Sequence, residues 1–376
     1  MKLRSLRLRN FRNHGDSRLE FGDAVNVLLG GNGQGKTNVL EAISYFGLAK
    51  SFYAASDGIA LKLGEKTFEI EGTISGEAAG EQSIAIRYDG ESGVKEIMVN
   101  RIRLEKIHLL IGRFPVVMLS PESGRITSGP PAERRKFLDL ALTQQSRVYF
   151  EDLLEYRRAL KQRNNLLAEA REGGAVSDDL LAPWTQRLVQ IGSRIVCRRR
   201  EFVKRFQKVV EVVYRTLSGN TEEVSIQYKT TQGVSPEADT AGIADGLESE
   251  FLRARSEEIR RGITLVGPHR DDLLMTIDSK SVQAYASQGQ HKTLLLAMKS
   301  AEFNQICEQR GEIPVLLLDD LFGDLDAERS ERIMDAVSGF GQSIITATGD
   351  YVFRNIVQWN GNNRRFSIEN GTCTPR

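Results

Sequence analysis

The residues best suited to chemistry are Gly30, Gly35, Lys36 and Thr37, whose spacing fits the pattern G-x-x-x-x-G-K-[ST]. Glycines let backbone N–H groups approach phosphate oxygens because no Cβ stands in the way. A lysine at this position pairs with the β- and γ-phosphates, and the threonine hydroxyl is a ligand for Mg²⁺. The spacing therefore predicts a phosphate-binding loop for a nucleotide.

The segments around this loop fit the strand–loop–helix context that the pattern requires. An apolar run at residues 25–29 precedes the loop, and a helix carrying Val39 and Leu40 follows it. A helix N-terminus favours an anion, so the context supports nucleotide binding over an accidental glycine-rich turn. A polar, positively charged segment at residues 9–14 lies close by in sequence. The predicted nucleotide-binding residues are Gly30, Gly31, Asn32, Gly33, Gln34, Gly35, Lys36, Thr37 and Asn38, together with Arg12 and Asn13.

A second apolar run, at residues 313–318, ends in the two carboxylates Asp319 and Asp320. Such a run is typical of a parallel strand buried on both faces, and ligands bind at the carboxyl ends of such strands. We expect Asp319 to hold the Mg²⁺ that Thr37 also contacts. Asp320 would lie beside the γ-phosphate as the catalytic base or as the group that orients water.

A third element consists of Ser287, Gln288, Gly289 and Gln290, followed by a helical run at residues 293–299. A serine before a glycine at a helix N-terminus presents backbone N–H groups and a hydroxyl, which suit a phosphate. Taken alone, the segment is also consistent with an ordinary helix cap. Its place between the phosphate loop and the acidic strand favours a role in nucleotide binding.

The composition is that of a globular chain without a strong overall charge. The chain has 376 residues, of which 40% are hydrophobic and 27% charged, and its formal net charge is +1. Attraction to nucleic acid must therefore come from local patches. Three scattered cysteines and four dispersed histidines show no metal-ligand spacing, and no apolar run approaches the ~20 residues of a membrane span. We expect a cytoplasmic protein in a reducing compartment, without a membrane partner.

The segments between the motifs predict an α/β head interrupted by a helical insertion. Strands are expected within residues 2–22, as an antiparallel meander within residues 67–99, and at residues 114–119. Between residues 132 and 216, two amphipathic helices with a turn at residues 173–174 predict a short antiparallel arm. Residues spaced by threes and fours mark the seam of the second helix: Trp184, Leu188, Ile191, Ile195, Arg198, Phe202, Phe206, Val209 and Val213.

The predicted organisation has three regions. Residues 1–118 form the first part of the head, with the phosphate loop, and residues 119–262 form the helical arm. Residues 263–376 form the second part of the head, with Ser287 and the acidic strand. Within the arm region, residues 219–243 are polar and rich in turn residues, which predicts a weakly structured hairpin or linker.

Together the motifs resemble the ATP-binding-cassette ATPase heads of the SMC and RecF group. Residues 287–290 are similar to the cassette signature L-S-G-G-Q, with Gln288 where the first glycine usually stands. The resemblance narrows to the bacterial RecF family at four segments: residues 33–38 (GQGKTN), 134–139 (RRKFLD), 267–272 (GPHRDD) and 318–320 (LDD). It implies an ABC-type ATPase head, which is a mixed sheet with a P-loop core and an antiparallel sub-sheet, with an inserted α-helical arm.

The resemblance also implies a function. Members of the family are recombination mediators that bind ATP with Mg²⁺, bind double-stranded and gapped or single-stranded DNA, and dimerise with ATP. Two heads would meet head-to-tail, each Ser287 capping the γ-phosphate held by the Lys36 of the other copy, with Asp324 and Asp326 in the loop that crosses the dimer. The family works with RecR, and indirectly with RecO and RecA, to load RecA at gaps in damaged or stalled DNA. Weak DNA-stimulated ATPase activity and a part in the SOS response are also implied.

Several positions depart from the wider cassette pattern. Asp320 stands where the catalytic glutamate usually lies, and Ser120 follows residues 114–119 in place of a glutamine. The switch histidine is missing, so Thr346 or Thr348 would have to serve. We therefore expect slow hydrolysis that acts as a timer, in a protein that is mainly an ATP-switched DNA binder.

Contact with DNA is expected from basic residues that a dimer would align. The candidates are Lys50, Lys62, Arg134, Arg135, Arg199, Arg200 and Lys204. Phosphate contacts of this kind would make binding fall steeply with salt. For the basic stretch at residues 198–208, an ordinary solvated helix face is the alternative.

Two other functions share part of the pattern, namely the ATPase subunit of an ABC transporter and a small-molecule P-loop kinase. The helical arm, residues 267–272 and the missing switch histidine speak against a transporter. A kinase would not explain residues 287–290. A long coiled-coil SMC protein is excluded because residues 132–216 are too few for its arm.

Overall fold

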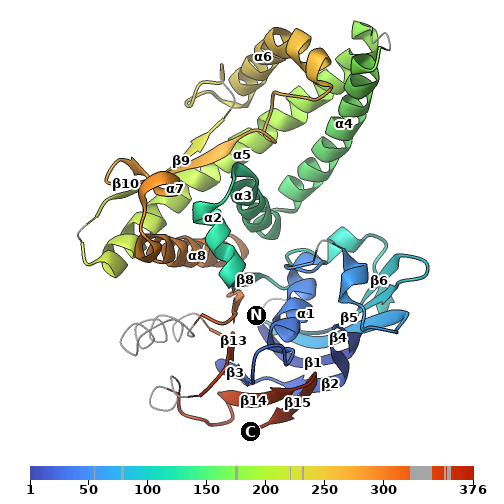
Figure 1. Cartoon of the computed structure of the whole chain (residues 1–376), viewed down its shortest axis with the longest axis vertical. Helices are drawn as coiled ribbons and strands as arrows, with labels where there is room; N and C mark the ends of the chain where they lie inside the picture. The colour runs from blue at the N-terminus through green and yellow to red at the C-terminus, as the bar shows by residue number, and fades with distance from the viewer. Residues whose placement is uncertain are drawn as a thin grey trace. The chain divides into compact units, whose positions relative to one another are not determined.

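The computed structural model describes residues 1–54, 56–77, 80–173, 177–220, 222–230, 233–321, 341–350, 353 and 357–376. These form two compact units, which we call the head unit (Met1–Ser123 with Glu302–Arg376) and the arm unit (Gly124–Ala301) (Figure 1). The phosphate loop and the acidic strand belong to the head unit, whereas residues 287–290 belong to the arm unit. Within the described ranges, no helix is both long and apolar enough to cross a membrane.

The centre of the head unit is a six-stranded, mostly parallel sheet. Its strands are β3 (Val25–Leu29), β8 (Val116–Leu119), β12 (Val315–Leu318), β13 (Ser343–Ala347), β14 (Arg364–Glu369) and β15 (Thr372–Pro375), in the order β15-β14-β3-β13-β12-β8. Only β15 pairs antiparallel. Every residue of β3, β8, β12 and β13 is buried, as expected for parallel strands covered on both faces. The carboxyl ends of β3 and β12 therefore lie at one edge of the sheet.

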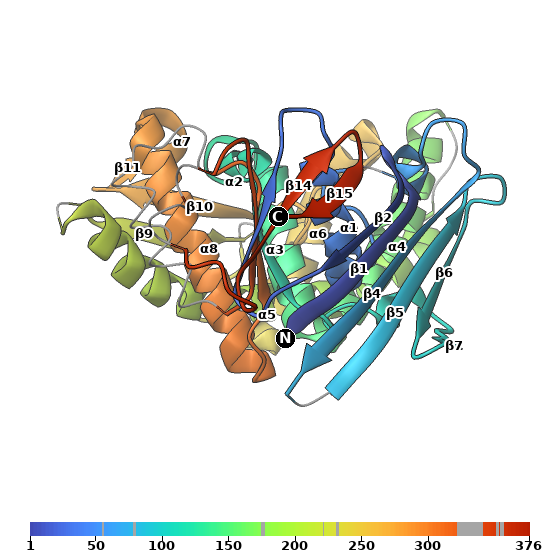
Figure 2. The ribbon, with the colours of Figure 1, turned by 90° about the horizontal axis from the view of Figure 1, so that it is seen from below.

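The second sheet of the head unit is entirely antiparallel (Figure 2). Its strands are β1 (Lys2–Phe11), β2 (His14–Glu20), β4 (Thr67–Gly76), β5 (Gly80–Asp89), β6 (Val94–Val99) and β7 (Ile102–Arg103), in the order β2-β1-β4-β5-β6-β7. The predicted meander is confirmed, and the first two strands extend it. Alternate residues of β4 are buried, and its other face carries ion pairs such as Arg9 with Glu69 at 2.6 Å. Exposed pairs contribute about 1 kcal/mol at most, so the buried side chains stabilise this sheet.

Helix α1 (Lys36–Leu48) packs against one strand of each sheet, β1 and β13, and so lies between the two sheets. All but two of its residues are buried, which explains the apolar run that follows the phosphate loop. Three short 3₁₀ helices complete the connections: η1 (Asp57–Ala60), η2 (Ile107–Leu109) and η3 (Pro121–Gly124).

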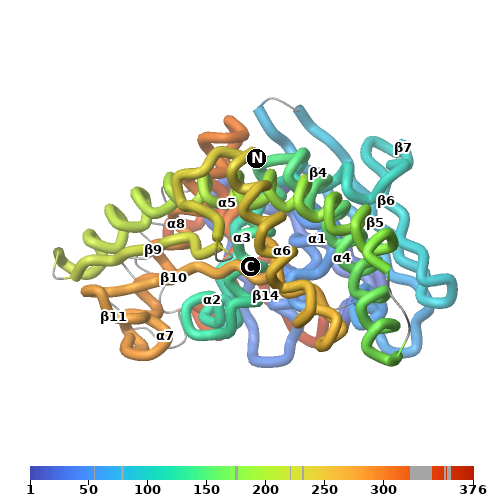
Figure 3. Tube along the Cα trace, turned by 90° about the horizontal axis from the view of Figure 1, so that it is seen from above, coloured from blue at the N-terminus to red at the C-terminus, as the bar shows by residue number. Residues whose placement is uncertain are grey.

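The arm unit consists mainly of helices, three of which pack against α5 (Asp178–Ser218), a helix of 41 residues (Figure 3). The other helices are α2 (Arg125–Ser128), α3 (Pro131–Gln145), α4 (Arg147–Arg171), α6 (Thr240–Arg261), α7 (Val282–Tyr285) and α8 (Gln288–Arg310), the last of which continues into the head unit. α3 begins at the predicted proline. α4 and α5 pack along each other, so the predicted pair of helices is confirmed, whereas residue 174 of the predicted turn lies outside the described residues.

The seam of α5 differs from the prediction at four positions: Trp184 is only half-buried, and at three other turns the buried residue is the one that follows the predicted residue. Leu188, Ile191, Ile195, Phe202 and Phe206 are buried as predicted. The residues buried in place of Arg198, Val209 and Val213 are Arg199, Val210 and Tyr214. Spacings of three and four residues leave this choice open at each turn, and contacts with neighbouring helices decide it.

A small antiparallel sheet of the arm unit overturns the prediction for residues 219–243. β9 (Val224–Lys229) pairs along its full length with β10 (Asp272–Ile277), which also pairs with β11 (Lys280–Ser281). The expected linker thus contains a regular strand. Because β10 pairs with β9, residues 263–301 stay in the arm unit, and the predicted transition after residue 262 falls inside that unit. The transition predicted after residue 118 lies close to the observed boundary at Ser123.

Candidate nucleotide-binding site

The phosphate loop connects β3 to α1 in a conformation that favours glycine at two positions. Gly33 and Gly35 have φ values of +77° and +109°, in the left-handed region. A Cβ on Gly35 would lie 2.5 Å from Asn13 Oδ1, and a Cβ on Gly30 would lie 2.4 Å from the Ile368 carbonyl oxygen. Close packing at Gly30 and Gly35 therefore leaves no room for a side chain at these two positions of the loop.

Lys36 is held inside this loop. Its Nζ donates to the carbonyl oxygens of Gly30 at 2.6 Å and Gly31 at 2.8 Å, and the residue is only 7% exposed. Burial lowers the pKa of Lys36, while the negative charges of Asp320 and Asp319 act in the opposite direction. The ammonium is thus a cation with neutral partners, which phosphate oxygens would replace favourably.

Asp319 brings the two predicted ATP motifs together. Its Oδ1 accepts hydrogen bonds from Thr37 Oγ1 at 2.9 Å and from Thr346 Oγ1 at 2.7 Å, and its Oδ2 accepts one from the Tyr53 hydroxyl at 2.7 Å. The residue is 5% exposed, so these three donors compensate for the loss of hydration of a buried carboxylate. Burial, followed by the charge of Asp319, raises the pKa of Tyr53, so its hydroxyl stays protonated and donates.

The contact between Thr37 and Asp319 fits a magnesium ion. Mg²⁺ prefers oxygen ligands and is usually bound by one or two protein oxygens together with waters and substrate phosphates. A hydroxyl and a carboxylate at the edge of the phosphate loop supply that donor set. Across the described ranges, no group of three or more His, Cys, Asp or Glu residues is placed to hold a metal, so Mg²⁺ here would depend on phosphate ligands.

Asp320 leaves the strand in an unusual conformation. Its φ is +48°, its side chain is exposed, and its backbone N–H donates to Thr346 Oγ1 at 2.8 Å. A non-glycine residue in the left-handed region is uncommon and is stabilised here by that hydrogen bond. The carboxylate therefore stands at the end of β12 beside the buried Asp319. The predicted dimer-crossing residues Asp324 and Asp326 lie outside the described residues.

The turn between β1 and β2 braces the phosphate loop. The Asn13 amide donates to the Gln34 carbonyl at 3.0 Å and accepts from Asn38 Nδ2 at 2.8 Å. Arg12 forms a bidentate pair with the buried Glu41 of α1, with both distances 2.8 Å. The Arg12 guanidinium thus anchors α1, and its predicted contact with a nucleotide stays a prediction.

Sequence reasoning missed several residues that support the site. Gln34 is also held by the β14–β15 hairpin, since its Oε1 accepts from the Asn370 N–H at 2.7 Å and its carbonyl from the Gly371 N–H at 2.9 Å. His14, which is fully buried, places Nε2 3.1 Å from the Gly35 carbonyl. No spacing motif links these residues, or Tyr53, to the loop.

A cavity of about 450 Å³ adjoins the phosphate loop within the head unit. Its lining residues include Gly30, Gly31, Gln34, Thr348, Glu369 and Asn370. The cavity opens at the carboxyl ends of β3, β13 and β14, which is the edge where parallel sheets bind ligands. Of the two threonines considered for the missing switch histidine, Thr346 contacts Asp319 and Thr348 lines this cavity.

The signature residues form a reciprocal cap at the start of α8 in the arm unit. Ser287 Oγ accepts from the Gln290 N–H at 3.2 Å, and Gln290 Oε1 accepts from the Ser287 N–H at 2.8 Å. This is the capping-box arrangement, which orders a helix N-terminus. Ser287, Gln288 and Gly289 are exposed. The two interpretations of this segment are therefore compatible, because the cap leaves the exposed end of the helix able to meet an anion.

Two residues predicted to contact DNA have structural roles instead. Arg134 and Arg199 are only 4% and 2% exposed. Arg134 pairs with Asp272 through Nε and Nη2 at 2.6 and 2.9 Å, and Arg199 donates to the Pro268 carbonyl and to Asp139, each at 2.7 Å. Because partners within the arm unit occupy these guanidiniums, the prediction that they contact DNA is wrong. The position of Arg199 between Ile195 and Phe202 on the helix was the signal for its burial.

The other predicted DNA contacts are distributed over both units. Arg135 donates to the Asp271 carbonyl at 2.8 Å, and burial lowers its pKa. Arg200 donates to the Pro236 carbonyl at 2.7 Å. The remaining candidates are exposed or half-exposed: Lys50, Lys62 and Lys204. These stay predictions.

Residues 267–272 connect the helices and the small sheet of the arm unit. His269 is half-buried, with Nδ1 2.8 Å from the Tyr156 hydroxyl and Nε2 3.1 Å from the Thr264 carbonyl oxygen. A carbonyl oxygen can only accept, so Nε2 carries a proton and donates to it, and in the neutral ring Nδ1 accepts from the Tyr156 hydroxyl. Burial lowers the pKa of His269 to about 4. This segment therefore links α4, through Tyr156, to the strand β10 within the arm unit.

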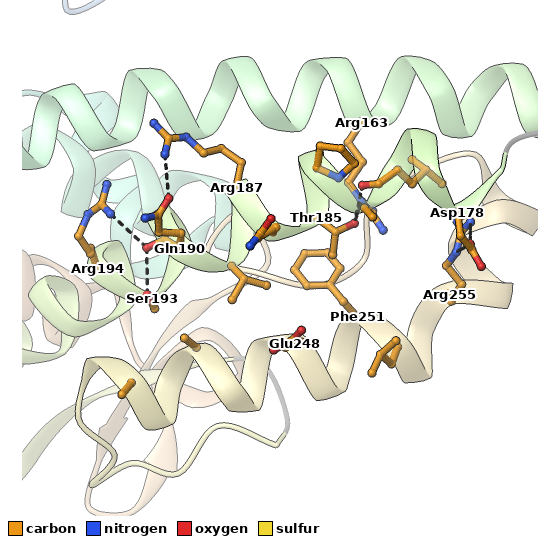
Figure 4. Close-up of a pocket in the computed structure, with 18 of the residues that line it drawn as sticks. Arg163, Asp178, Thr185, Arg187, Gln190, Ser193, Arg194, Glu248, Phe251 and Arg255 are labelled. Carbon is orange, nitrogen blue, oxygen red and sulfur yellow. Dashed lines mark hydrogen bonds and ion pairs between the residues drawn. The ribbon is translucent and has the colours of Figure 1, made fainter.

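A larger cavity, of about 1260 Å³, lies between α5 and α6 of the arm unit (Figure 4). Its apolar lining includes Leu181, Val189 and Phe251. Each arginine that borders it pairs with a carboxylate: Arg163, Arg187, Arg194 and Arg255. The arginines that border this cavity are thus ion-paired within the arm unit, and the phosphate loop assigns the nucleotide site to the head unit.

Comparison with known proteins shows which family this chain resembles. A family model described as RecF/RecN/SMC N terminal domain matches residues 2–365. The DNA replication and repair protein RecF of Salinibacter ruber is 42% identical over 351 residues, which are 93% of this chain and 85% of that protein. The proteins of the same name from Chloroherpeton thalassium and Bacillus subtilis are 39% and 34% identical, over 95% and 93% of this chain and 98% and 93% of theirs.

Solved structures agree with the sequence similarity. Two structures of the recombination mediator protein RecF in the RecFOR pathway, designated RecF-ATPrS and RecF-ATP, align with TM-scores of 0.92 and 0.90 at 32% and 31% identity. Each alignment covers 100% of this chain, and 98% and 99% of the solved chains. An Smc head bound to the C-winged helix domain of ScpA aligns with a TM-score of 0.54 at 14% identity, over 100% and 97% of the two chains, and so shares the fold alone. The predicted α/β ATPase-head fold is confirmed.

Proposed function

Because the chain belongs to the RecF family of DNA replication and repair proteins, within the wider RecF/RecN/SMC group, we propose that it is an ATP-switched recombination mediator. In this proposal the head unit binds ATP with Mg²⁺, two copies join head-to-tail, and the dimer closes on DNA. The dimer works in the cytoplasm with RecR, and indirectly with RecO and RecA, to load RecA at gaps in damaged or stalled DNA. Its setting is DNA repair, replication and the SOS response.

The observation that carries the proposal is the contact of Thr37 with Asp319 beside the buried Lys36. This contact joins the phosphate loop to the acidic strand, as a nucleotide site with Mg²⁺ requires. Similarity to DNA repair proteins over more than nine-tenths of the chain speaks against a transporter subunit or a metabolite kinase.

The chain's own residues account for ATP binding as follows. Lys36 exchanges the carbonyls of Gly30 and Gly31 for phosphate oxygens, and the N–H groups of the loop donate to the same anion. Thr37 and Asp319 would hold Mg²⁺, which neutralises phosphate charge when bound. Tyr53 and Thr346 keep the Asp319 carboxylate oriented, since both donate to it.

Hydrolysis is slow in this proposal because an aspartate stands in place of the usual catalytic glutamate and the switch histidine is missing. Asp320, exposed at the end of β12, is the candidate base. Its side chain is one methylene shorter than that of a glutamate. Closure of the dimer then serves as the switch, with Ser287 of one copy capping the γ-phosphate bound by the other, and hydrolysis ends the closed state.

Light scattering with and without ATP and duplex DNA tests this proposal. The wild-type protein should be a monomer that dimerises only when ATP is present, and DNA should favour the dimer. Lys36→Met should stay monomeric because it lacks the phosphate-binding cation. DNA binding by the ATP-bound protein should weaken steeply with salt. A wild-type protein that remains monomeric at saturating ATP would refute the proposal.

A further inference from the structure

The carboxylate of Glu222 lies between the last turns of α5 and the first turn of α8, within the arm unit. Its Oε1 accepts a hydrogen bond from Gln290 Nε2 at 2.8 Å, and its Oε2 accepts one from the Tyr214 hydroxyl. Tyr214 is fully buried in α5, and burial raises the pKa of its hydroxyl, which therefore stays protonated and donates. One carboxylate thus connects the long helix of the arm to the signature residues.

This contact fixes which way the Gln290 amide points. With Nε2 donating to Glu222, Oε1 is turned to the Ser287 N–H, which it accepts at 2.8 Å. The reverse orientation would place two oxygens against each other and two N–H groups against each other, which is unfavourable. Glu222 therefore selects the capping box at the start of α8.

The capping box in turn decides which groups remain for a ligand. The N–H groups of Ser287 and Gln290 are used within the cap. Gln288 and Gly289 are exposed in the first turn, where N–H groups have no partner inside the helix. The Ser287 hydroxyl accepts from Gln290 and keeps its own proton to donate. The signature is thus preorganised as a donor set for phosphate.

We propose that Glu222 is a positioning residue of the signature and that, through Tyr214, it couples the signature to α5. The inference rests on the proposed function, in which the signature meets the phosphate held by a second copy. α5 also carries three exposed basic residues in the turns before Tyr214: Lys204, Arg205 and Lys208. DNA phosphates bound there would act on the same rigid helix that holds Glu222.

The first test compares Glu222→Ala with Glu223→Gln as a matched control. Glu223 is the neighbouring acid, it is exposed, and no hydrogen bond joins its side chain to the signature in the described structure. The readout is the dissociation constant of the ATP-dependent dimer by light scattering, with ATP affinity of the single chain measured separately with a fluorescent ATP analogue. Loss of a hydrogen bond to a charged group should weaken the dimer by about tenfold in Glu222→Ala and leave Glu223→Gln unchanged. ATP affinity should not change in either.

Glu222→Gln and Tyr214→Phe make the test independent of any folding defect. Glu222→Gln keeps one oxygen that can accept from Gln290. The dissociation constant of its dimer should therefore rise by only about threefold, to a value between those of the wild type and Glu222→Ala. Tyr214→Phe leaves the contact of Glu222 with Gln290 intact, so its dimer without DNA should match the wild type. Its DNA stimulation of dimerisation should fall by at least about threefold, because the link to α5 is lost.

The outcomes separate the inference from the function on which it rests. If the wild-type protein dimerises with ATP and Glu222→Ala dimerises equally well, the inference is wrong and the proposed function stands. The coupling part fails if Tyr214→Phe keeps the full DNA stimulation. A wild-type protein that does not dimerise with ATP overturns both.

Discussion

Replacing Arg199 by methionine should destabilise the arm unit strongly, although this arginine lies in the basic stretch of α5. Its guanidinium donates to the Tyr149 hydroxyl at 2.9 Å, to the Pro268 carbonyl at 2.7 Å and to Asp139 at 2.7 Å. Removing one partner of a buried ion pair costs roughly 3–5 kcal/mol. Asp139 keeps the Tyr149 hydroxyl at 2.6 Å and Arg157 at 3.1 Å, so we expect the lower end, about 3 kcal/mol.

Urea unfolding followed by tryptophan fluorescence measures this effect. Trp184 lies in α5 and Trp359 in the head unit, so a Trp359→Phe background leaves a reporter for the arm unit alone. At a urea dependence of about 2 kcal/mol per molar, the midpoint of the transition should fall by about 1.5 M in Arg199→Met.

Lys204→Met is the matched control, because it removes an exposed cation from the same helix. Its free energy of unfolding should change by less than about 0.5 kcal/mol. Its DNA affinity should fall, and so should the salt dependence of that affinity. The structural role of Arg199 would be refuted by a stability loss below about 1 kcal/mol together with weaker DNA binding, since that pattern belongs to a phosphate contact.

Three further predictions concern pH, the loop and the cap. His269 has a pKa of about 4 in the fold and about 6.5 when unfolded, so its contribution is present above pH 6.5 and is lost as the pH falls toward 4. Between pH 7 and 5 the wild-type protein should lose about 2 kcal/mol more unfolding free energy than His269→Gln, measured in urea; equal losses would contradict the assigned neutral ring. Gly35→Ala should weaken ATP binding at least about tenfold by calorimetry, because its Cβ would meet Asn13 at a φ of +109°; wild-type affinity would show that the loop relaxes freely. Ser287→Ala should lower the free energy of unfolding by about 1 kcal/mol and prevent ATP-dependent dimerisation, while the single chain still binds ATP. Normal dimerisation of this variant would show that Ser287 does not contribute to the interface.

The sequence predicted the parts of the site that depend on local chemistry. The glycine spacing, the lysine and the two acids can each be recognised within a short segment, because each meets a local requirement for backbone conformation or charge. The structure brings the two segments into contact through the hydrogen bond between Thr37 and Asp319. The antiparallel meander and the helical pair were predicted for the same reason, because their periodicity is local. The residues that brace the site could not be predicted in this way. Tyr53 reaches Asp319, and Asn370 reaches Gln34, only through the tertiary fold.

The basic residues of the arm show that residue type alone does not predict which side chains are exposed. Arg199 and Lys204 look alike in the sequence, yet one is fully enclosed and the other exposed. Their different roles follow from the partners that other elements bring, such as Asp139 from α3. Helical spacing from Ile195 to Phe202 was the only local signal of this difference.

The order of strands in the central sheet has a consequence for how the chain folds during synthesis. β3, which leads into the phosphate loop, has β13 on one side and β14 on the other, and both emerge from the ribosome long after it. The whole arm unit is made in between, and its helix contacts are largely local. Local contacts form early and distant strand pairs form late. The arm should therefore be folded while β3 still lacks both neighbours, and a newly made chain acquires its phosphate loop among its last steps.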